Sequence, residues 1–204
     1  MNFYHNLITD KSWQLLLNLR KKYKFILIGG WAVFLYTQAL KSKDIDLVVE
    51  FPELDKLHNE FGVHKNDRLK KYESKVEGLD IDIYVPFYSN PGLPAEDLKK
   101  YTFSLEGFKV PKMEALAILK QKALIERAGT VKGRKDLIDL VSLFLLADFD
   151  WDKYHQIINK YQLSDHLQFV CEILTKTTKI EELDLNIHKM AKFKKRVLPL
   201  FSIR

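Results

Sequence analysis

The chain has 204 residues, and its hydrophobic content of 47% is enough for one large or two small folded domains, which excludes a disordered chain. Lysine and arginine (33) outnumber aspartate and glutamate (27), and the net charge of +6 favours an anionic partner or substrate. A single cysteine excludes an internal disulfide and any multi-cysteine metal site.

The sequence predicts neither a membrane span nor a secretory signal. Its longest uncharged apolar stretch, residues 25–36, contains Gly29-Gly30 and is well short of the roughly 20 residues that a membrane helix needs. The amino terminus, MNFYHNLITD, lacks a basic region followed by an apolar core. We therefore expect a cytoplasmic protein with no membrane partner.

Helical and strand patterns alternate in the first half of the chain. The expected elements are a helix over residues 11–22 capped by Thr9 or Asp10, a buried strand over 25–28, a helix over 31–40 and a strand over 44–51. Residues 70–87 then predict a β-hairpin that turns at Glu77-Gly78, and residues 103–111 predict a short second hairpin.

From Pro111 onward the apolar spacing is helical. We expect helices over about 112–128, 134–147, 152–161, 164–177 and 181–196, with Asp150 or Ser164 as possible caps. The aromatic stretch FDWDKYHQII has helical spacing, so it favours packing over a base-stacking platform. This change of composition predicts an α+β fold with two domains, an α/β core over residues 1–110 and a helical domain over 111–204.

Two carboxylates begin the strand predicted over residues 44–51. Asp44 and Asp46 are two residues apart, so their side chains leave the same face, about 6–7 Å apart at the Cα atoms. Both can reach one divalent ion, and carboxylate oxygens without histidine or thiolate favour Mg²⁺ or Mn²⁺ over zinc. Because Mg²⁺ completes its shell with water and substrate phosphates, the pair predicts a phosphorylated substrate.

The second arm of the first hairpin repeats this pattern. Asp80 and Asp82 alternate with apolar Ile81 and Ile83, so a third carboxylate reaches the site if the two strands are neighbours. Three carboxylates can hold the two metals of a phosphoryl or nucleotidyl displacement. We favour Asp82, since Asp80 lies closer to the turn; the alternative for either residue is the solvated face of an edge strand.

Gly29 and Gly30 close one predicted strand and open a helix. Backbone N–H groups at such a turn can approach phosphate oxygens, although a simple tight turn is the alternative. With LIGGWAVFLY followed by KSKDIDLVV, the chain resembles the nucleotidyltransferase superfamily of the DNA polymerase β-like fold. The resemblance implies a mixed sheet with flanking helices, Asp44, Asp46 and Asp82 as catalytic metal ligands, and Gly29, Gly30 and the nearby Lys43 at the nucleotide.

The helical half carries a second resemblance, so that the match covers about residues 20–145. Residues 110–144 resemble the helical segment of the abortive-infection (AbiEii-like) toxin nucleotidyltransferases, and the residues on that pattern are Lys120, Arg127, Lys135, Asp136 and Asp139. Lys120 occupies an apolar stripe, which leaves it as either a phosphate-binding cation or the partner of Asp136 in a structural ion pair. For Arg127 we expect a salt bridge between helices.

Together these features predict an enzyme that transfers an NMP from an NTP to an RNA or protein hydroxyl, with Mg²⁺ or Mn²⁺ as cofactor. The resemblance implies a possible toxin or antitoxin partner, and the basic clusters at residues 20–24, 132–135 and 192–196 favour an anionic acceptor. The alternatives are a catalytically silent nucleotide-binding or regulatory partner of a toxin-antitoxin pair and a metal-dependent phosphohydrolase. The absence of histidine near the carboxylates disfavours the hydrolase.

Overall fold

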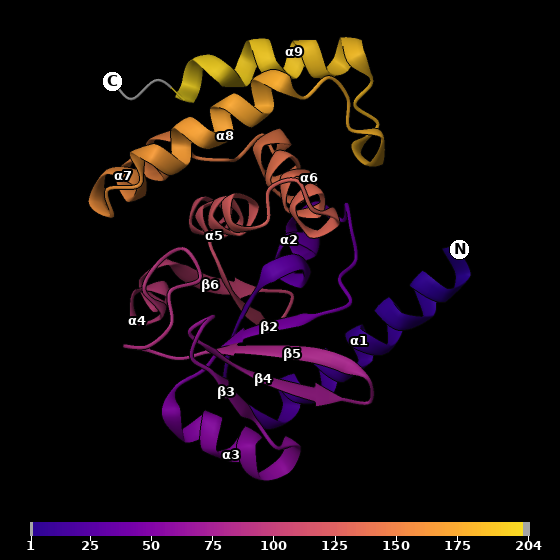
Figure 1. Cartoon of the computed structure of the whole chain (residues 1–204), viewed down its shortest axis with the longest axis vertical. Coiled ribbons are helices and arrows are strands. Elements are labelled where there is room, and N and C mark those ends of the chain that lie inside the picture. The colour runs from indigo at the N-terminus through magenta and orange to yellow at the C-terminus, as the bar shows by residue number, and fades with distance from the viewer. Residues whose placement is uncertain (1, 202–204) are drawn as a thin grey trace. The chain divides into compact units, whose positions relative to one another are not determined.

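The structure is a computed structural model that describes residues 2–201, with side chains described from Asn6 to Phe201. The chain divides between Lys112 and Met113 into two compact units (Figure 1). The first unit contains all the strands named here together with several helices, and the second is built from helices. The expected α+β class is confirmed. The domain bounds expected from the sequence reach residues 1 and 202–204, which lie outside the described residues.

A five-stranded mixed sheet forms the centre of the first unit, with the strand order β1-β2-β5-β4-β3. Figure 1 shows this order from β2 through β5 and β4 to β3. The strands are β1 (Ile26–Ile28), β2 (Ile45–Val48), β3 (His64–Asn66), β4 (Lys71–Val76) and β5 (Leu79–Tyr84). β2 and β5 are parallel, whereas the other neighbouring strands are antiparallel. The predicted hairpin at Glu77-Gly78 is confirmed as β4 and β5.

The sheet has one apolar and one polar face near its centre. Along β5, Leu79, Ile81 and Ile83 are buried, whereas the alternate residues are exposed (Asp80) or half-buried (Asp82 and Tyr84). Successive side chains of a strand point to opposite faces, so the alternation in the sequence fixes which residues enter the core. The same rule leaves the aspartates of β2 and β5 on a shared face.

Helices and a second, two-stranded sheet complete the first unit. These elements are α1 (Asn2–Lys22), α2 (Gly29–Thr37), α3 (Phe51–Phe61), α4 (Ala95–Leu98), the 3₁₀ helix η1 (Lys99–Tyr101), β6 (Thr102–Leu105) and β7 (Phe108–Pro111). β6 and β7 form the predicted second hairpin. Trp31 of α2 anchors α1, because its indole N–H donates to Ser12 Oγ at 2.9 Å and its ring lies 5.0 Å from that of Trp13.

Two expectations for the first unit are wrong in detail, and one strand was not expected. Thr9 and Asp10 do not cap a helix, since both lie inside the longer α1, where the Thr9 hydroxyl donates to Asn6 O. The strand predicted over residues 44–51 covers only Ile45–Val48, because α3 begins at Phe51 with a proline in its first turn. Strand β3 was not expected, since its residues are polar.

The second unit contains five α-helices within the described residues. They are α5 (Met113–Glu126), α6 (Val131–Leu145), α7 (Trp151–Lys160), α8 (Ser164–Lys176) and α9 (Ile187–Val197), with 3₁₀ helices η2 (Glu181–Leu183) and η3 (Leu198–Phe201). Asp150 caps α7 as predicted, because its side chain accepts from Lys153 N. Ser164 does not cap α8, and α9 begins later than predicted because Asn186 caps it.

Aromatic side chains form much of the core of the second unit. The rings of Phe149, Trp151 and Tyr154 all pack against Phe144, with centroids 4.9–5.8 Å apart. The expectation that this aromatic stretch serves packing is therefore confirmed. Among the described residues, no helix combines the length and the apolar character needed to cross a membrane.

Candidate active site

Three carboxylates lie at matching positions on neighbouring strands. Asp46 of β2 is the register partner of Asp82 of β5, and Asp82 is in turn the partner of Glu73 of β4. Register partners on neighbouring strands point to the same face with Cβ atoms about 4.5–5.5 Å apart. We call Asp46, Asp82 and Glu73 the carboxylate row. The expected condition, a strand carrying Asp82 beside the strand carrying Asp46, is met.

Asp44 lies just before β2 and adds a further negative charge. It is half-buried, and its carboxylate is close enough to influence Asp82 electrostatically. Burial raises the pKa of Asp82, and the charges of Glu73 and Asp44 raise it further, while Lys71 opposes them. The site thus holds a carboxylate whose proton affinity is increased, as expected where several negative charges share a face.

Lys71 places a positive charge directly against the carboxylate row. Its ammonium lies 2.6 Å from Asp82 Oδ2 and 2.9 Å from Glu73 Oε1. Burial lowers the pKa of Lys71, but the hydrogen bonds and charges of Asp82 and Glu73 outweigh burial and raise it. Lys71 is therefore a fully charged cation that bridges two members of the row.

The glycine turn lies against the first carboxylate. Gly29 begins α2 directly after β1 and has φ +69°, a left-handed conformation that glycine adopts without strain. A Cβ atom at this position would lie 2.0 Å from Asp46 Oδ2, so only glycine leaves room for the carboxylate. Gly30 is buried in the first turn of α2. The Asp46 carboxylate therefore lies against Gly29, the first residue of α2.

The donor set fits a divalent cation of the magnesium class. Asp46 and Asp82 present carboxylate oxygens from adjacent strands, and Mg²⁺ needs only one or two carboxylates when water and phosphate oxygens fill its other positions. In the described part of the chain, no three histidine, cysteine, aspartate or glutamate side chains are gathered into a ready-made metal site. The fit therefore rests on two carboxylates.

The other predicted residues of the first unit lie outside this group. Asp80 is exposed, and its carboxylate is 3.9 Å from the Lys75 ammonium, which leaves Asp82 as the carboxylate in register with Asp46. Lys43 is exposed in the segment that leads into β2. Its proposed contact with the nucleotide stays a prediction.

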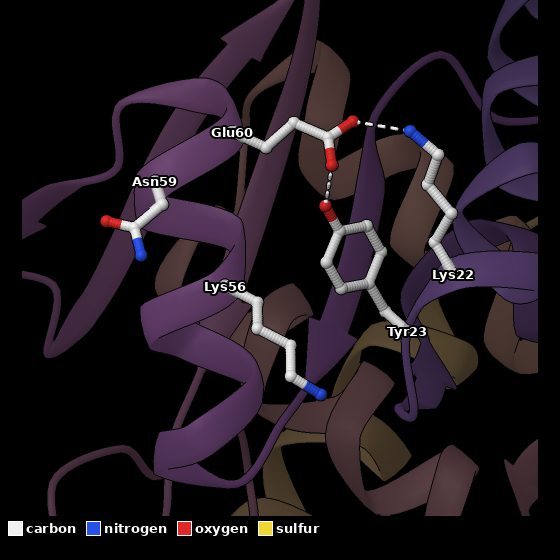
Figure 2. Close-up of a pocket in the computed structure, with 5 residues that line it drawn as sticks. All are labelled: Lys22, Tyr23, Lys56, Asn59 and Glu60. Carbon is white, nitrogen blue, oxygen red and sulfur yellow. Dashed lines mark hydrogen bonds and ion pairs between the residues drawn. The ribbon is translucent and has the colours of Figure 1, made fainter.

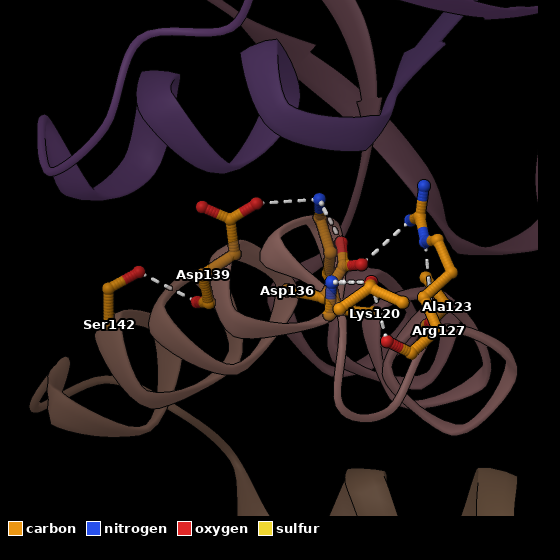
Figure 3. Close-up of polar contacts among 8 residues, drawn as sticks. Lys120, Ala123, Arg127, Asp136, Asp139 and Ser142 are labelled. Atoms are coloured by element: carbon orange, nitrogen blue, oxygen red, sulfur yellow. Dashed lines mark hydrogen bonds and ion pairs between the residues drawn. The ribbon is translucent and has the colours of Figure 1, made fainter.

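Lys120 belongs to the second unit, where two aspartates hold it (Figure 3). Its ammonium on α5 lies 3.2 Å from Asp136 Oδ1 and 2.6 Å from Asp139 Oδ2, and all three side chains are at most 7% exposed. Arg127 Nη2 binds the other oxygen of Asp136 at 2.8 Å, so the predicted salt bridge between helices is confirmed. The structural ion pair expected for Lys120 is present; its contact with a nucleotide stays a prediction.

An open hollow of about 450 Å³ lies between α1 and α3 (Figure 2). Lys22, Tyr23, Lys56, Asn59 and Glu60 line it. Figure 2 shows the Glu60 carboxylate between Lys22 and Tyr23, and it accepts from both side chains. Glu60 thereby offsets part of the positive charge of the hollow, which contains none of the residues predicted for catalysis.

Sequence reasoning missed Lys71 and Glu73. The signal was available, because a two-residue turn at Glu77-Gly78 sets the pairing of the two strands of a hairpin. Counting back from the pair Val76 and Leu79 brings Glu73 opposite Asp82. Lys71 lies on the same face as Glu73, two residues earlier in β4. A polar strand end was not recognised as part of the site.

Comparisons with known proteins give matches among solved structures only. No family model and no curated protein matches the sequence. A candidate nucleotidyltransferase from H. pylori is 15% identical, with a TM-score of 0.53 over 96% of this chain and 93% of that one. An antigenic nucleotidyltransferase-like protein from Paracoccidioides brasiliensis is 18% identical, with a TM-score of 0.44 over 79% and 92%. A candidate nucleotidyltransferase from Thermotoga maritima is 19% identical, with a TM-score of 0.45 over 64% and 94%.

The H. pylori structure shows the class of fold. The chain has a nucleotidyltransferase-like fold, in which helices flank a mixed sheet, as the sequence resemblance implied.

Proposed function

We propose that the protein is a metal-dependent nucleotidyltransferase that moves an NMP from an NTP to an acceptor hydroxyl and releases pyrophosphate. One observation carries this proposal: Asp46 and Asp82 are register partners, and Asp46 packs against Gly29 at the start of α2. A glycine turn that opens a helix beside a carboxylate pair offers backbone N–H groups to phosphates and oxygen ligands to a cation.

Residues of the first unit have separate roles in the proposed reaction. Asp44 and Asp46 would orient the triphosphate by holding the cation that its phosphates bind, and the N–H groups at Gly29 and Gly30 contact its phosphate oxygens. The acceptor oxygen attacks the α-phosphorus, and the bond from that phosphorus to the pyrophosphate oxygen breaks. Asp82, whose pKa burial raises, takes the proton of the attacking hydroxyl.

Mg²⁺ or Mn²⁺, when bound, would neutralise charge on the attacking and leaving oxygens. Asp44, Asp46 and Asp82 are the residues that would hold it. Lys43 and Lys120 are further proposed contacts of the nucleotide.

For the acceptor we propose RNA or a protein hydroxyl. The net charge of +6 supports an anionic macromolecule, because a positive surface raises the association rate of such a partner. A toxin-antitoxin role and a cytoplasmic location belong to the same proposal, and both rest on the sequence resemblance and the sequence pattern alone.

The test is transfer of label from each α-³²P-NTP to total RNA and to cell extract, with Mg²⁺ or Mn²⁺. The informative variant is Asp46→Asn, and Asp80→Asn on the neighbouring strand is the matched control, since Asp80 is exposed and lies outside the carboxylate row. We expect label and pyrophosphate from the wild type and from Asp80→Asn, with transfer by Asp46→Asn lower by at least about 100-fold.

Other outcomes would replace the proposal. NTP binding without transfer would indicate the nucleotide-binding regulatory partner, and phosphate release without labelled acceptor would indicate a hydrolase. Equal transfer by wild type and Asp46→Asn would show that the carboxylates are not the catalytic site.

A further inference from the structure

Lys71 is the first residue of β4, yet its side chain is nearly buried and two carboxylates contact it. Its side chain is 12% exposed, and its ammonium contacts both Asp82 at 2.6 Å and Glu73 at 2.9 Å. The side chain of Lys75, which follows on the same face of β4, is 69% exposed and lies 3.9 Å from Asp80. The two lysines share a strand and a face, but Lys71 pairs with two members of the carboxylate row, whereas Lys75 lies near Asp80 outside it.

The negative charge of the carboxylate row must be compensated by a cation, which is the Lys71 ammonium when no metal ion is bound. Asp46, Asp82 and Glu73 occupy consecutive register positions, so their charges repel one another on a partly buried face. The Lys71 ammonium compensates this repulsion at Asp82, where a divalent ion would also have to bind. Because the ammonium and a metal ion are both positively charged, they repel each other and compete for the Asp82 carboxylate, where Lys71 now lies 2.6 Å from Oδ2.

If the Lys71 ammonium leaves Asp82, it can remain paired with Glu73. One Glu73 oxygen already accepts from Lys71, and the other accepts from Asn66 Nδ2 at 3.1 Å, which fixes the orientation of the carboxylate. The side chain of Glu73 is 41% exposed, against 23% for Asp82, so Lys71 held by Glu73 alone would be closer to solvent. The exchange needs only a movement of the lysine side chain.

We propose that Lys71 is the resident counterion of the carboxylate row, that a divalent cation displaces it from Asp82, and that Glu73 retains it. This inference rests on the proposed function, because it assumes that Asp82 is a ligand of the metal. It assigns Lys71 and Glu73 a role as positioning residues that set how tightly the site binds its cation.

The first test is Mn²⁺ affinity, measured by the electron paramagnetic resonance signal of free Mn²⁺, for wild type, Lys71→Met and Lys75→Met. Because the metal no longer has to break an ion pair at Asp82, Lys71→Met should bind Mn²⁺ about tenfold more tightly. Lys75→Met removes the same charge from the same face and should change the affinity less than about twofold. Circular dichroism of each variant confirms that it is folded.

The second test follows the Lys71 side chain directly while Mg²⁺ is added. In wild type labelled with ¹³Cε-lysine, the Lys71 signal, identified by its absence from Lys71→Arg, should shift as Mg²⁺ is added. The midpoint of this shift should equal the midpoint of Mg²⁺ binding measured by calorimetry. The Lys75 signal should stay constant, and in Asp82→Asn the Lys71 signal should not respond to Mg²⁺.

The outcomes separate this inference from the proposed function. Mn²⁺ binding by the wild type, with Lys71→Met unchanged or weaker and a constant Lys71 signal, would overturn the inference and leave the proposed function standing. Failure of the wild type and Lys71→Met to bind Mn²⁺ at millimolar concentration, both with and without NTP, would overturn both.

Discussion

At Gly29, both the backbone conformation and the contact with Asp46 disfavour any larger residue. An alanine there combines a strained positive φ with a Cβ 2.0 Å from Asp46 Oδ2. We expect Gly29→Ala to lower the free energy of unfolding by roughly 2–4 kcal/mol and to abolish nucleotidyl transfer, because Asp46 must move. Urea unfolding and the labelled-NTP assay measure the two effects.

Gly78 provides the control for backbone strain alone. It has φ +83°, but a Cβ there would meet nothing within 4 Å. Gly78→Ala should therefore cost about 1–2 kcal/mol and leave transfer unchanged. Equal losses of stability and activity in both variants would contradict the role given to the contact with Asp46.

Lys120 makes a second prediction at the scale of one residue. Lys120→Met removes from the buried carboxylate of Asp139 the cation that lies 2.6 Å from its Oδ2, whereas Arg127 pairs with the neighbouring Asp136. We expect a loss of about 3–5 kcal/mol in urea unfolding, the usual cost of removing one partner from a buried ion pair.

Lys122→Met on the same helix is the matched control. The Lys122 side chain is 29% exposed and its ammonium lies 3.7 Å from Glu126, so this change should cost less than about 1 kcal/mol. Adding Asp139→Leu to Lys120→Met should recover much of the lost stability, because no charge is then left unpaired at that position. No recovery would mean that Lys120 stabilises the unit by packing rather than by charge.

At the scale of elements, Glu60 links α3 to the end of α1. Its carboxylate accepts hydrogen bonds from Lys22 at 2.7 Å and from the Tyr23 hydroxyl. Both bonds lower the pKa of Glu60, and the bond from Lys22 has the larger effect. A carboxyl group whose pKa is lower in the folded state stabilises the fold above its unfolded pKa of 4.5 and loses this contribution as the pH falls further. Glu60→Gln should therefore unfold at lower urea than wild type at pH 7, and the difference should narrow below about pH 4.5.

The same substitution has a spectroscopic consequence in alkali. Burial, followed by the hydrogen bond to Glu60, raises the pKa of Tyr23 to about 12. Glu60→Gln should lower this pKa, as measured by absorbance titration of tyrosinate. Asp55→Asn on the exposed face of α3 is the control and should change neither measurement. An unchanged Tyr23 titration in Glu60→Gln would argue against the link between the two helices.

At the scale of the whole molecule, we expect the two compact units to behave as two domains. Leu47 in the first unit and Leu140 in the second are both fully buried. Replacing either by alanine should cost about 2–5 kcal/mol. If the units unfold separately, Leu140→Ala should accelerate amide hydrogen exchange in α5 and α6 far more than in β2 and β5, and Leu47→Ala should do the reverse. Equal acceleration throughout the chain by either variant would show a single cooperative unit.

The sequence predicted the parts of the fold that depend on local patterns. Alternating apolar residues identified β5 and its partner β4, and the glycine turn was correctly placed between β1 and α2, where it adjoins the candidate site. Helix α3 was not predicted at all, because Val49 and Phe51 continued an apolar run, although Pro52 marked a helix start. The role of Lys71 depends on cross-strand distances, which spacing along one strand does not give.

The pairing of β5 with β2 and β4 determines which loops can change in length. The segment between β2 and β5 can gain residues in its loops without altering which aspartates face each other, because β2 and β5 pair independently of the path between them. The two-residue turn at Glu77-Gly78 has no such freedom. If the turn keeps two residues and one added residue joins the end of β4, Ser74 comes opposite Asp82, and the lysine and glutamate of β4 move to other partners. Homologous chains should therefore vary in length around α3 and β3 and keep this turn constant.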